Sequence, residues 1–280
     1  MIKLANDVRA DLHSHTTASD GVLLPAELVR EAAARGLTHI AISDHDTLAG
    51  IAPAQQAAHD HGIDVIPAIE VTCRSGEQEI HVLGLCIDAN SADLIAFAGM
   101  VRRARYERYV AMVERLRDVC GLADLTVEAA VPVKEGSLGR PELARMLLEM
   151  KYVGRLQEAF DMWLGKGKPA FVPNSAPDVS EALAAIHGAG GASILAHCGL
   201  YRDGEALAAR LLDQGLMGIE VFHPDHSVSR QERLLALARE RKALVSGGAD
   251  FHEHDSPKAK HFGRVYVGRT DLERLFEATN

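Results

Sequence analysis

The chain has 280 residues, of which 47% are hydrophobic, and its formal net charge is -9. This length is sufficient for one large α/β domain that carries an insertion. The negative charge argues against nonspecific binding to long DNA, because such binding needs a basic surface. No apolar run reaches membrane-spanning length and no signal-peptide core lies near the start, so we expect a cytoplasmic protein without a membrane partner.

The four cysteines show no C-x-x-C spacing, so we expect neither a disulfide framework nor a zinc ribbon. Cys198 follows His197 directly and could pass for a nucleophile. A small buried cysteine beside a strand end is the commoner situation, and we therefore expect no thiol catalysis.

Residues 1–90 alternate between apolar strand patterns and amphipathic helix patterns. The first predicted helix has Pro25 in its first turn and Gly36 at its end, which is the usual asymmetry of helix termini. In chain order we expect a strand over 8–12, a helix over 25–36, a strand over 37–43, a helix over 47–61, and strands over 63–71 and 79–87.

Residues 91–167 break this alternation. Charged, arginine-rich amphipathic segments such as MVRRARYERYVAMVERLRDV (100–119) and GRPELARMLLEM (139–150) replace the strands. Their periodicity predicts helices. We therefore interpret 91–167 as a helical insertion that forms a cap over the mouth of a barrel, between barrel segments 1–90 and 168–280.

Residues 168–280 return to the strand and helix alternation. The total is seven strands, one fewer than in a complete eight-stranded β/α barrel. In this segment we expect a helix over 179–187, a strand over 192–197, a helix over 205–214, a strand over 218–222, a helix over 228–241 and a strand over 243–250.

Five histidine-bearing fragments fall where these strands should end, together with an acid in PAIEVT (67–72). Imidazole and carboxylate groups are the ligands that hold Zn, Mn or Fe and leave a position open for water. Their recurrence at successive strand ends predicts a multinuclear metal site on one rim of the barrel. The fragments are DLHSHTTASDG (11–21), SDHD (43–46), EIHVLG (79–84), LAHCG (195–199) and GGADFH (247–252).

One H-x-H pair by itself proves little, because the chain has 14 histidines. His59 and His61 close a predicted helix before Gly62, where imidazoles interact favourably with the helix dipole. His13 and His15 instead follow a strand directly. We therefore expect the first pair to be structural and the second to bind metal.

The motifs D-L-H-x-H-T-x-x-S-D-G, S-D-H-D, the acid after strand three, the isolated histidine on strand four, A-H-x-G and G-x-D-x-H resemble, in this order, those of the PHP (polymerase and histidinol phosphatase) family. The resemblance covers nearly the whole chain. Within that family, G-R-P-x-x-A-R and G-K-P-A-F-V are similar to a subgroup of 3',5'-nucleotide bisphosphate phosphatases, which is related to enzymes that shorten RNA from the 5' end.

The resemblance implies a distorted seven-stranded β/α barrel that binds two or three divalent ions, with Mn favoured and Zn or Fe as alternatives. Mixed nitrogen and oxygen ligands agree with these ions rather than Mg, and a bridging carboxylate keeps two cations at working distance. By motif, His13, His15 and Asp250 would hold the first ion, Glu70 would bridge it to a second held by His81 and His197, and Asp20, His45 and His252 would hold the third.

Three further acids lie beside these ligands. Asp11 and Asp44 could accept hydrogen bonds from imidazole N–H groups, and Asp44 is also a candidate catalytic residue. Asp46 is expected to cap the next helix, which is the commoner role of an aspartate in that position.

Contacts to substrate phosphate must come from other residues. Arg140 precedes Pro141 at a helix start, so its guanidinium and the free N–H groups of that helix could face an anion. Lys168 lies where the insertion returns to the barrel. His223, after the sixth strand, could touch the phosphate or protonate the leaving oxygen, whereas His226 and His254 are expected to face solvent.

The expected activity is direct in-line hydrolysis of the 3'-phosphate of a 3',5'-bisphosphonucleoside, with the second phosphate held by Arg140 and Lys168. Histidinol-phosphate phosphatase and a 5'-3' exonuclease on short RNA are alternatives that the same metal motifs permit. A non-catalytic PHP module is an alternative of a different class, against which the complete ligand set argues.

Overall fold

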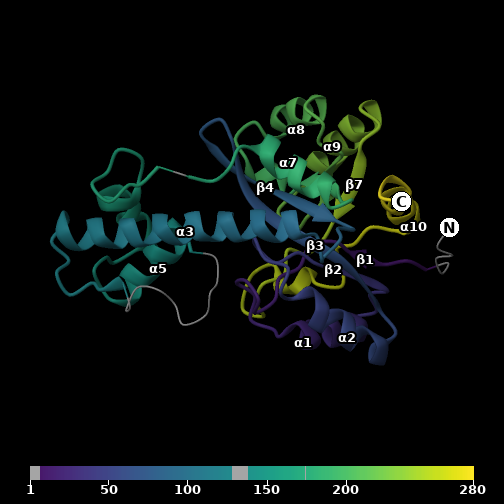
Figure 1. Cartoon of the computed structure of the whole chain (residues 1–280), viewed down its shortest axis with the longest axis horizontal. Coiled ribbons are helices and arrows are strands. Elements are labelled where there is room, and N and C mark those ends of the chain that lie inside the picture. Colours follow the sequence, from purple (N-terminus) through teal and green to yellow (C-terminus); the bar gives the residue numbers. More distant parts are fainter. Residues whose placement is uncertain (1–6, 128–137, 174) are drawn as a thin grey trace. The chain divides into compact units, whose positions relative to one another are not determined.

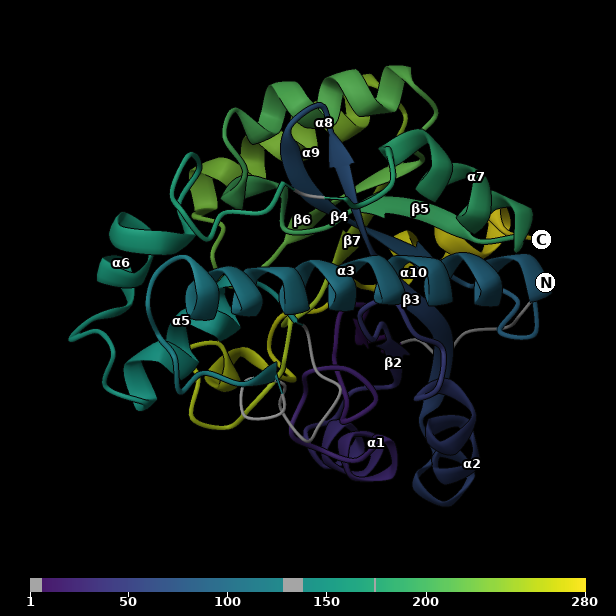
Figure 2. The same cartoon turned by 60° about the vertical axis from the view of Figure 1, so that its left-hand side comes forward.

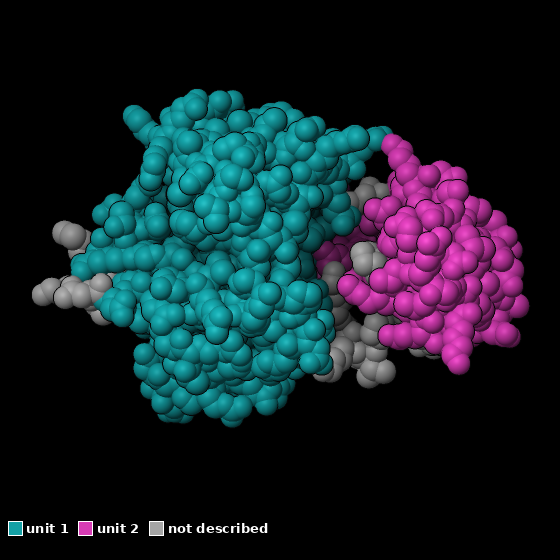
Figure 3. All heavy atoms as spheres, turned by 180° about the vertical axis from the view of Figure 1, so that it is seen from behind, with its two compact units in different colours: residues 1–99, 177–280 teal, residues 100–176 magenta. Residues whose placement is uncertain are grey.

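A computed structural model describes residues 7–127, 138–173 and 175–280 of the chain (Figure 1). The chain divides into two compact units. One comprises residues 1–99 and 177–280, and the other comprises residues 100–176, in teal and magenta in Figure 3. The candidate ligands all belong to the first unit, and Arg140 and Lys168 belong to the second.

The first unit is built on one sheet that contains seven strands within the described residues. The strands lie side by side in chain order, which is the arrangement that a β/α barrel requires. They are β1 (Ala10–Asp11), β2 (His39–Ile42), β3 (Asp64–Ser75), β4 (Gln78–Leu85), β5 (Ala192–Leu195), β6 (Gly218–Phe222) and β7 (Leu244–Gly247).

The sheet nearly closes, because backbone hydrogen bonds join the residues just after β1 to β7 and to the segment that follows it. Leu12 N donates to Gly247 O over 3.0 Å, and Asp250 N donates to His13 O over 2.9 Å. The predicted seven-stranded α/β barrel is therefore confirmed. Strand β4 is the exception to the parallel order, because it runs antiparallel to both β3 and β5.

The antiparallel β4 changes the expected position of His81. A tight turn at Gly76, which has φ of 63°, joins β3 to β4, and the register pairs Thr72 with His81. His81 thus lies near the start of β4. The prediction that it lies at the end of a strand is wrong. Because the start of an antiparallel strand meets the ends of its parallel neighbours, His81 still reaches the same rim.

Alternation along the strands places two acids inside the barrel. Ala68 packs in the inner apolar cluster with Ala41 and Leu83, whereas Ile69 and Val71 pack in the outer cluster beneath the helices. Side chains two residues apart share one face of a strand. Glu70 in β3 therefore lies on the inner face, and the same alternation places Glu220 inside from β6, because Ile219 and Val221 pack outside.

Helices cover the outside of the sheet (Figures 1 and 2). Helices α1 and α2 lie together against the N-terminal strands, and α8 packs beside α9, which lies against β6. Helix α10 contributes Leu272 and Leu275 to the inner cluster and closes the barrel end where β2 begins. The bounds are α1 (Pro25–Ala34), α2 (Ile51–His61), α7 (Val179–Gly188), α8 (Gly204–Asp213), α9 (Val228–Glu240) and α10 (Arg269–Ala278), with short 3-10 turns η2 (Cys198–Leu200) and η3 (Ala259–His261).

Helix α2 begins four residues later than the predicted start at Thr47. Asp46 has φ of 50°, which an α-helix does not permit, and its carboxylate accepts a hydrogen bond from Thr72 N at 2.7 Å. The residue before the helix is Gly50. The prediction that Asp46 caps α2 is therefore wrong.

The second unit is helical in its described residues. Long α3 (Ala92–Asp118) enters it from the first unit and is followed by α5 (Arg140–Glu149), α6 (Leu156–Ala159) and the π-helix η1 (Phe160–Leu164). It has its own apolar core, which includes Tyr109. The predicted insertion over 91–167 overlaps this unit, and its role as a cap stays a prediction.

Among the described residues, no helix combines the length and apolarity that crossing a membrane demands.

Candidate metal centre

Glu70 lies at the centre of the predicted ligands. Its carboxylate is 1% exposed, and five imidazole nitrogens surround it. Oε1 lies 3.1 Å from both His81 Nδ1 and His197 Nε2, and Oε2 lies 3.2 Å from His45 Nδ1 and 3.3 Å from both His13 Nε2 and His15 Nε2. A single carboxylate thus connects histidines from both halves of the barrel.

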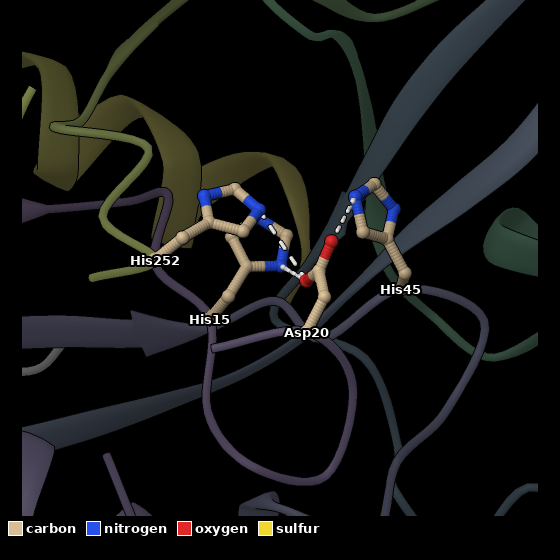
Figure 4. A group of neighbouring side chains, drawn as sticks. All are labelled: His15, Asp20, His45 and His252. Carbon is tan, nitrogen blue, oxygen red and sulfur yellow. Dashed lines mark ion pairs between the residues drawn. The ribbon is translucent and has the colours of Figure 1, made fainter. Parts of the chain in front are cut away.

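Asp20 organises the edge of this cluster, which Figure 4 shows. Its Oδ1 lies 3.3 Å from His252 Nε2 and 3.5 Å from His15 Nδ1, and its Oδ2 lies 3.7 Å from His45 Nε2. One ligand atom from each of these four residues lies within 4.8 Å of the other three. That spacing suits a single cation.

The two oxygens of Asp250 face different neighbours. Oδ1 lies 3.4 Å from His15 Nε2, 3.4 Å from His252 Nδ1 and 3.5 Å from His13 Nε2. Oδ2 faces His223 and Lys258 instead. His13, His15 and Asp250 form a second candidate ligand group, and His45, Glu70 and His81 form a third.

The cluster leaves buried nitrogen atoms without hydrogen-bond partners in the described part of the chain. Buried polar atoms are normally paired, and unpaired imidazole nitrogens that face carboxylates suit a bound cation. The residues present therefore fit divalent metal ions. The unpaired atoms that face carboxylates are His13 Nε2, His15 Nδ1, His15 Nε2 and His45 Nδ1, and His197 Nδ1 is unpaired as well.

Electrostatics keep the central carboxylates ionised. Burial opposes ionisation of Glu70 and Asp250, but the neighbouring imidazoles outweigh burial and hold the pKa of both carboxyls well below their usual range. Burial also opposes the charge of His15, yet the carboxylates of Asp250 and Glu70 raise its pKa to about 10. The cluster of carboxylates thus attracts positive charge.

Glu220 is a site residue that the sequence reasoning missed. Its Oε1 accepts a hydrogen bond from His13 Nδ1 at 3.0 Å, and its Oε2 accepts one from His197 N at 2.5 Å. The first contact leaves His13 Nε2 free to face Glu70 and a metal ion. An acid at an inward position of the strand GIEVF was the signal that could have revealed it.

Asp44 holds the loop that carries the first ligands. Its two oxygens accept hydrogen bonds from Thr16 N and Thr16 Oγ1, both at 2.7 Å, and from Ser19 Oγ at 2.6 Å. These contacts make Asp44 a support for the loop, whereas its predicted catalytic role stays a prediction. Gly21 permits the same tight loop, because a Cβ there would lie 2.4 Å from His15 O.

Asp11 also differs from its expected role. It is fully buried and accepts hydrogen bonds from the backbone N–H groups of His13, at 3.2 Å, and Ala249, at 3.1 Å. The prediction of an imidazole N–H donor to Asp11 is therefore wrong. The carboxylate instead fixes the backbone where β1 meets the chain after β7.

His223 is buried, and both of its ring nitrogens have partners. Asp225 N donates to His223 Nδ1 over 3.2 Å, so the ring proton lies on Nε2, which donates to Asp250 Oδ2 over 3.3 Å. These contacts orient Asp250. The predicted contact of His223 with phosphate, or proton donation by it, stays a prediction.

The expectation that His226 faces solvent is wrong, because its side chain is buried. Its Nδ1 donates to Val221 O over 2.9 Å, and its Nε2 accepts from Gly199 N at 3.0 Å. His226 therefore connects the segments that follow β5 and β6. His254 is 49% exposed, as predicted.

The other H-x-H pair lies outside the cluster. His59 and His61 are exposed in the last turn of α2, and Gly62 ends the helix with φ of 63°. The capping interpretation of this pair agrees with the structure.

Cys198 is buried, and burial raises the pKa of its thiol to about 12, so no thiolate forms near neutral pH.

Tyr201 supports two candidate ligands and was also missed. Its hydroxyl oxygen accepts a hydrogen bond from His81 N at 2.8 Å, and its ring centroid lies 5.5 Å from that of His197.

In the second unit, Arg140 begins α5 and its guanidinium lies over the Phe171 ring, and Lys168 is exposed. The substrate contacts predicted for Arg140 and Lys168 stay predictions.

Comparisons with known proteins agree with this geometry. Residues 11–163 match the PHP domain family. A 5'-3' exoribonuclease from Haemophilus influenzae is 34% identical over 86% of this chain and 89% of its own length. A 3',5'-nucleoside bisphosphate phosphatase from Chromobacterium violaceum is 33% identical over 86% of each chain.

A solved structure from Bifidobacterium adolescentis, described as a metal-dependent phosphoesterase, has the same fold. It superposes with a TM-score of 0.80 at 29% identity and covers 97% of this chain and 96% of its own. The similarity therefore extends over both units of the chain and is not confined to the histidine motifs.

Proposed function

Because this chain belongs to the PHP domain family of metal-dependent phosphoesterases, we propose that it removes the 3'-phosphate of 3',5'-bisphosphonucleosides. The products are a nucleoside 5'-monophosphate and inorganic phosphate. The observation that carries this proposal is the convergence of six histidine side chains on the buried Glu70 and on its neighbours Asp20 and Asp250.

We assign the ligand sets as the sequence motifs imply, and the short distances among these side chains support a cluster of cation sites. His13, His15 and Asp250 hold one ion, His81 and His197 hold a second, and Glu70 lies between the two sets. Asp20, His45 and His252 hold a third ion at the edge. We favour Mn, with Zn or Fe as alternatives, because the ligands mix imidazole nitrogen with carboxylate oxygen.

Divalent ions in these positions would stabilise the charge on phosphoryl oxygens and lower the pKa of an attacking water molecule. The chain itself supplies the orientation of the ligands. Glu220 fixes the proton of His13 on Nδ1, and His223 fixes one oxygen of Asp250. The burial of these groups excludes bulk water and strengthens their electrostatic interactions.

The nucleotide substrate is supported by the similarity to the bisphosphate phosphatase across 86% of each chain. In the proposed binding mode, Arg140 and Lys168 hold the 5'-phosphate while the 3'-phosphate reacts. A second phosphate held away from the reacting centre orients the substrate, so binding energy contributes to rate. The net charge of -9 does not oppose this, because bound cations invert the local sign of the field.

Chromatography of the reaction products tests the proposal. Manganese-loaded protein should convert adenosine 3',5'-bisphosphate to adenosine 5'-monophosphate and phosphate, and the 5'-monophosphate should accumulate. The Asp250→Asn variant is the inactive control. Accumulation of the 3'-monophosphate, or rapid cleavage onward to adenosine, would refute the binding mode, and failure to release phosphate would refute the activity.

A 5'-3' exoribonuclease activity on short RNA is a second candidate. The similarity to the Haemophilus influenzae exoribonuclease, over nearly the same share of the chain, favours it. A short 5'-phosphorylated oligoribonucleotide offers the discriminating assay, because stepwise loss of nucleotides from its 5' end would establish the second activity. Phosphate release from histidinol phosphate should be measured alongside, because that compound is the substrate of another PHP phosphatase.

A further inference from the structure

Lys258 is a cation of the first unit that reaches the metal centre and has no part in the ligand sets. It lies in the segment between β7 and η3, eight residues after Asp250. Its ammonium group contacts Asp250 Oδ2 and lies 3.4 Å from Asp225 Oδ2. No sequence motif pointed to it, because a single lysine in an irregular segment has no characteristic spacing.

Lys258 lies beside the ligand cluster because the two oxygens of the Asp250 carboxylate face different neighbours. Oδ1 faces His13, His15 and His252, which is the side of the candidate metal ligands. Lys258 approaches the other oxygen, so its ammonium stands beside the ligand cluster without occupying it. The ammonium is therefore placed to contact an anion that ions in the cluster would hold.

Exposure distinguishes Lys258 from its neighbour His223. The His223 side chain is fully buried, and both of its ring nitrogens are taken by Asp225 N and Asp250 Oδ2. The Lys258 side chain is 26% exposed. An ammonium has three donors, so Lys258 can keep Asp250 as a partner and still contact an anion that enters from solvent.

Charge balance supports the same conclusion. Metal ions beside Asp250 would take up much of the negative charge that now attracts the ammonium. The lysine then keeps only Asp225 as a full acidic partner, and an entering anion would stabilise its charge further. The phosphate of the substrate is the anion that the proposed function brings to this position.

We propose that Lys258 contacts the non-bridging oxygens of the phosphate that reacts, as a substrate-binding residue supplied by the barrel. This inference rests on the proposed function for the identity of the substrate. It assigns Lys258 to the reacting phosphate, in contrast to Arg140 and Lys168, which we assign to the phosphate that does not react.

The test is calorimetric binding of inorganic phosphate to the manganese-loaded full chain, with elemental analysis of each sample. We expect Lys258→Met to weaken phosphate binding about ten- to a hundredfold, the range for loss of one charge-assisted hydrogen bond. The manganese content should not change. Lys258→Arg should recover part of the affinity, and Lys260→Met, which removes an exposed lysine two residues away, should bind as the wild type does.

Two outcomes would overturn the proposal. Unchanged phosphate affinity in Lys258→Met would remove Lys258 from the substrate site, and a parallel loss of manganese would show that it acts only through Asp250. Lys258→Gln provides the same comparison if the methionine variant does not fold. Lys258-dependent phosphate binding in a wild type that hydrolyses no bisphosphate would leave this inference standing while the proposed function fails.

Discussion

At the scale of single residues, Glu220 shows how an acid outside the proposed ligand sets can still control the site. Its contact with His13 Nδ1 sets which nitrogen of the ring is free. We predict that Glu220→Gln lowers metal affinity or activity about ten- to a hundredfold, the usual effect of losing such a partner. Metal titration followed by elemental analysis measures it.

The matched control is Glu232→Gln, which changes an exposed acid on α9. It should retain the affinity and activity of the wild type. If Glu220→Gln retains them as well, the hydrogen bond to His13 does not control the ligand, and the role assigned to Glu220 is wrong.

The two H-x-H pairs give a second prediction at this scale. His13 is buried beside Glu70, whereas His61 is exposed at the end of α2. His13→Ala should lose metal and turnover, because it removes a nitrogen that faces Glu70 and Asp250. His61→Ala should lose neither. Equal loss of kcat in the two variants would contradict the separation of the pairs.

At the scale of elements, the β3–β4 hairpin depends on a residue from the neighbouring segment. Tyr201 Oη accepts the N–H of His81, and the ring packs beside His197. Tyr201→Phe removes the acceptor of that half-buried N–H group, which costs about 1 kcal/mol. We therefore predict a lower free energy of unfolding together with weaker metal binding.

Denaturant unfolding and metal titration of the Tyr201→Phe variant measure the two effects separately. A variant that loses stability but binds metal as the wild type does would show that Tyr201 supports only the fold. Unchanged values of both would show that water replaces the hydroxyl.

The start of β2 gives a prediction for pH dependence, away from the metal centre. Burial lowers the pKa of His39, and Asp64 offsets this only in part. A group whose pKa is lower in the fold takes up a proton first in the unfolded chain, so the free energy of unfolding falls as pH drops below about 6.5. Denaturant titrations in chelator, between pH 7.5 and 5.5, should show a smaller decrease for His39→Gln than for the wild type.

Local patterns predicted the elements well, but contacts between distant segments were not visible in them. The alternation of strands and helices, the seven strands and the metal-competent histidines all follow from periodicity and motif spacing. The antiparallel direction of β4 does not, because an apolar run has the same pattern in either direction. The roles of Glu220, Tyr201 and His226 depend on hydrogen-bond partners that lie more than twenty residues away along the chain.

Asp46 and Asp11 show that a local pattern can also predict a wrong role. Each lies in a local context that favours a familiar role, a helix cap or an imidazole partner, yet each instead accepts backbone N–H groups from another strand or segment. Tertiary contacts overrode the local preference in both cases.

At the scale of the whole molecule, we have proposed that Arg140 of the second unit holds the phosphate that does not react. Arg140→Ala should raise KM for a 3',5'-bisphosphate about ten- to a hundredfold, because it removes a charge-assisted contact to the phosphate that does not react. KM for a simple phosphomonoester should change little. Arg145→Ala, at an exposed arginine of the same helix, is the control, and equal effects of Arg140→Ala on both substrates would place Arg140 elsewhere.

The metal content of the purified chain tests the central claim most directly. The nine proposed ligands predict two to three equivalents of divalent transition metal per chain, about three when Mn is supplied in excess. Removal of the metal by chelator should abolish phosphate release, and added Mn should restore it. Protein that contains no metal and retains full activity in chelator would contradict the account.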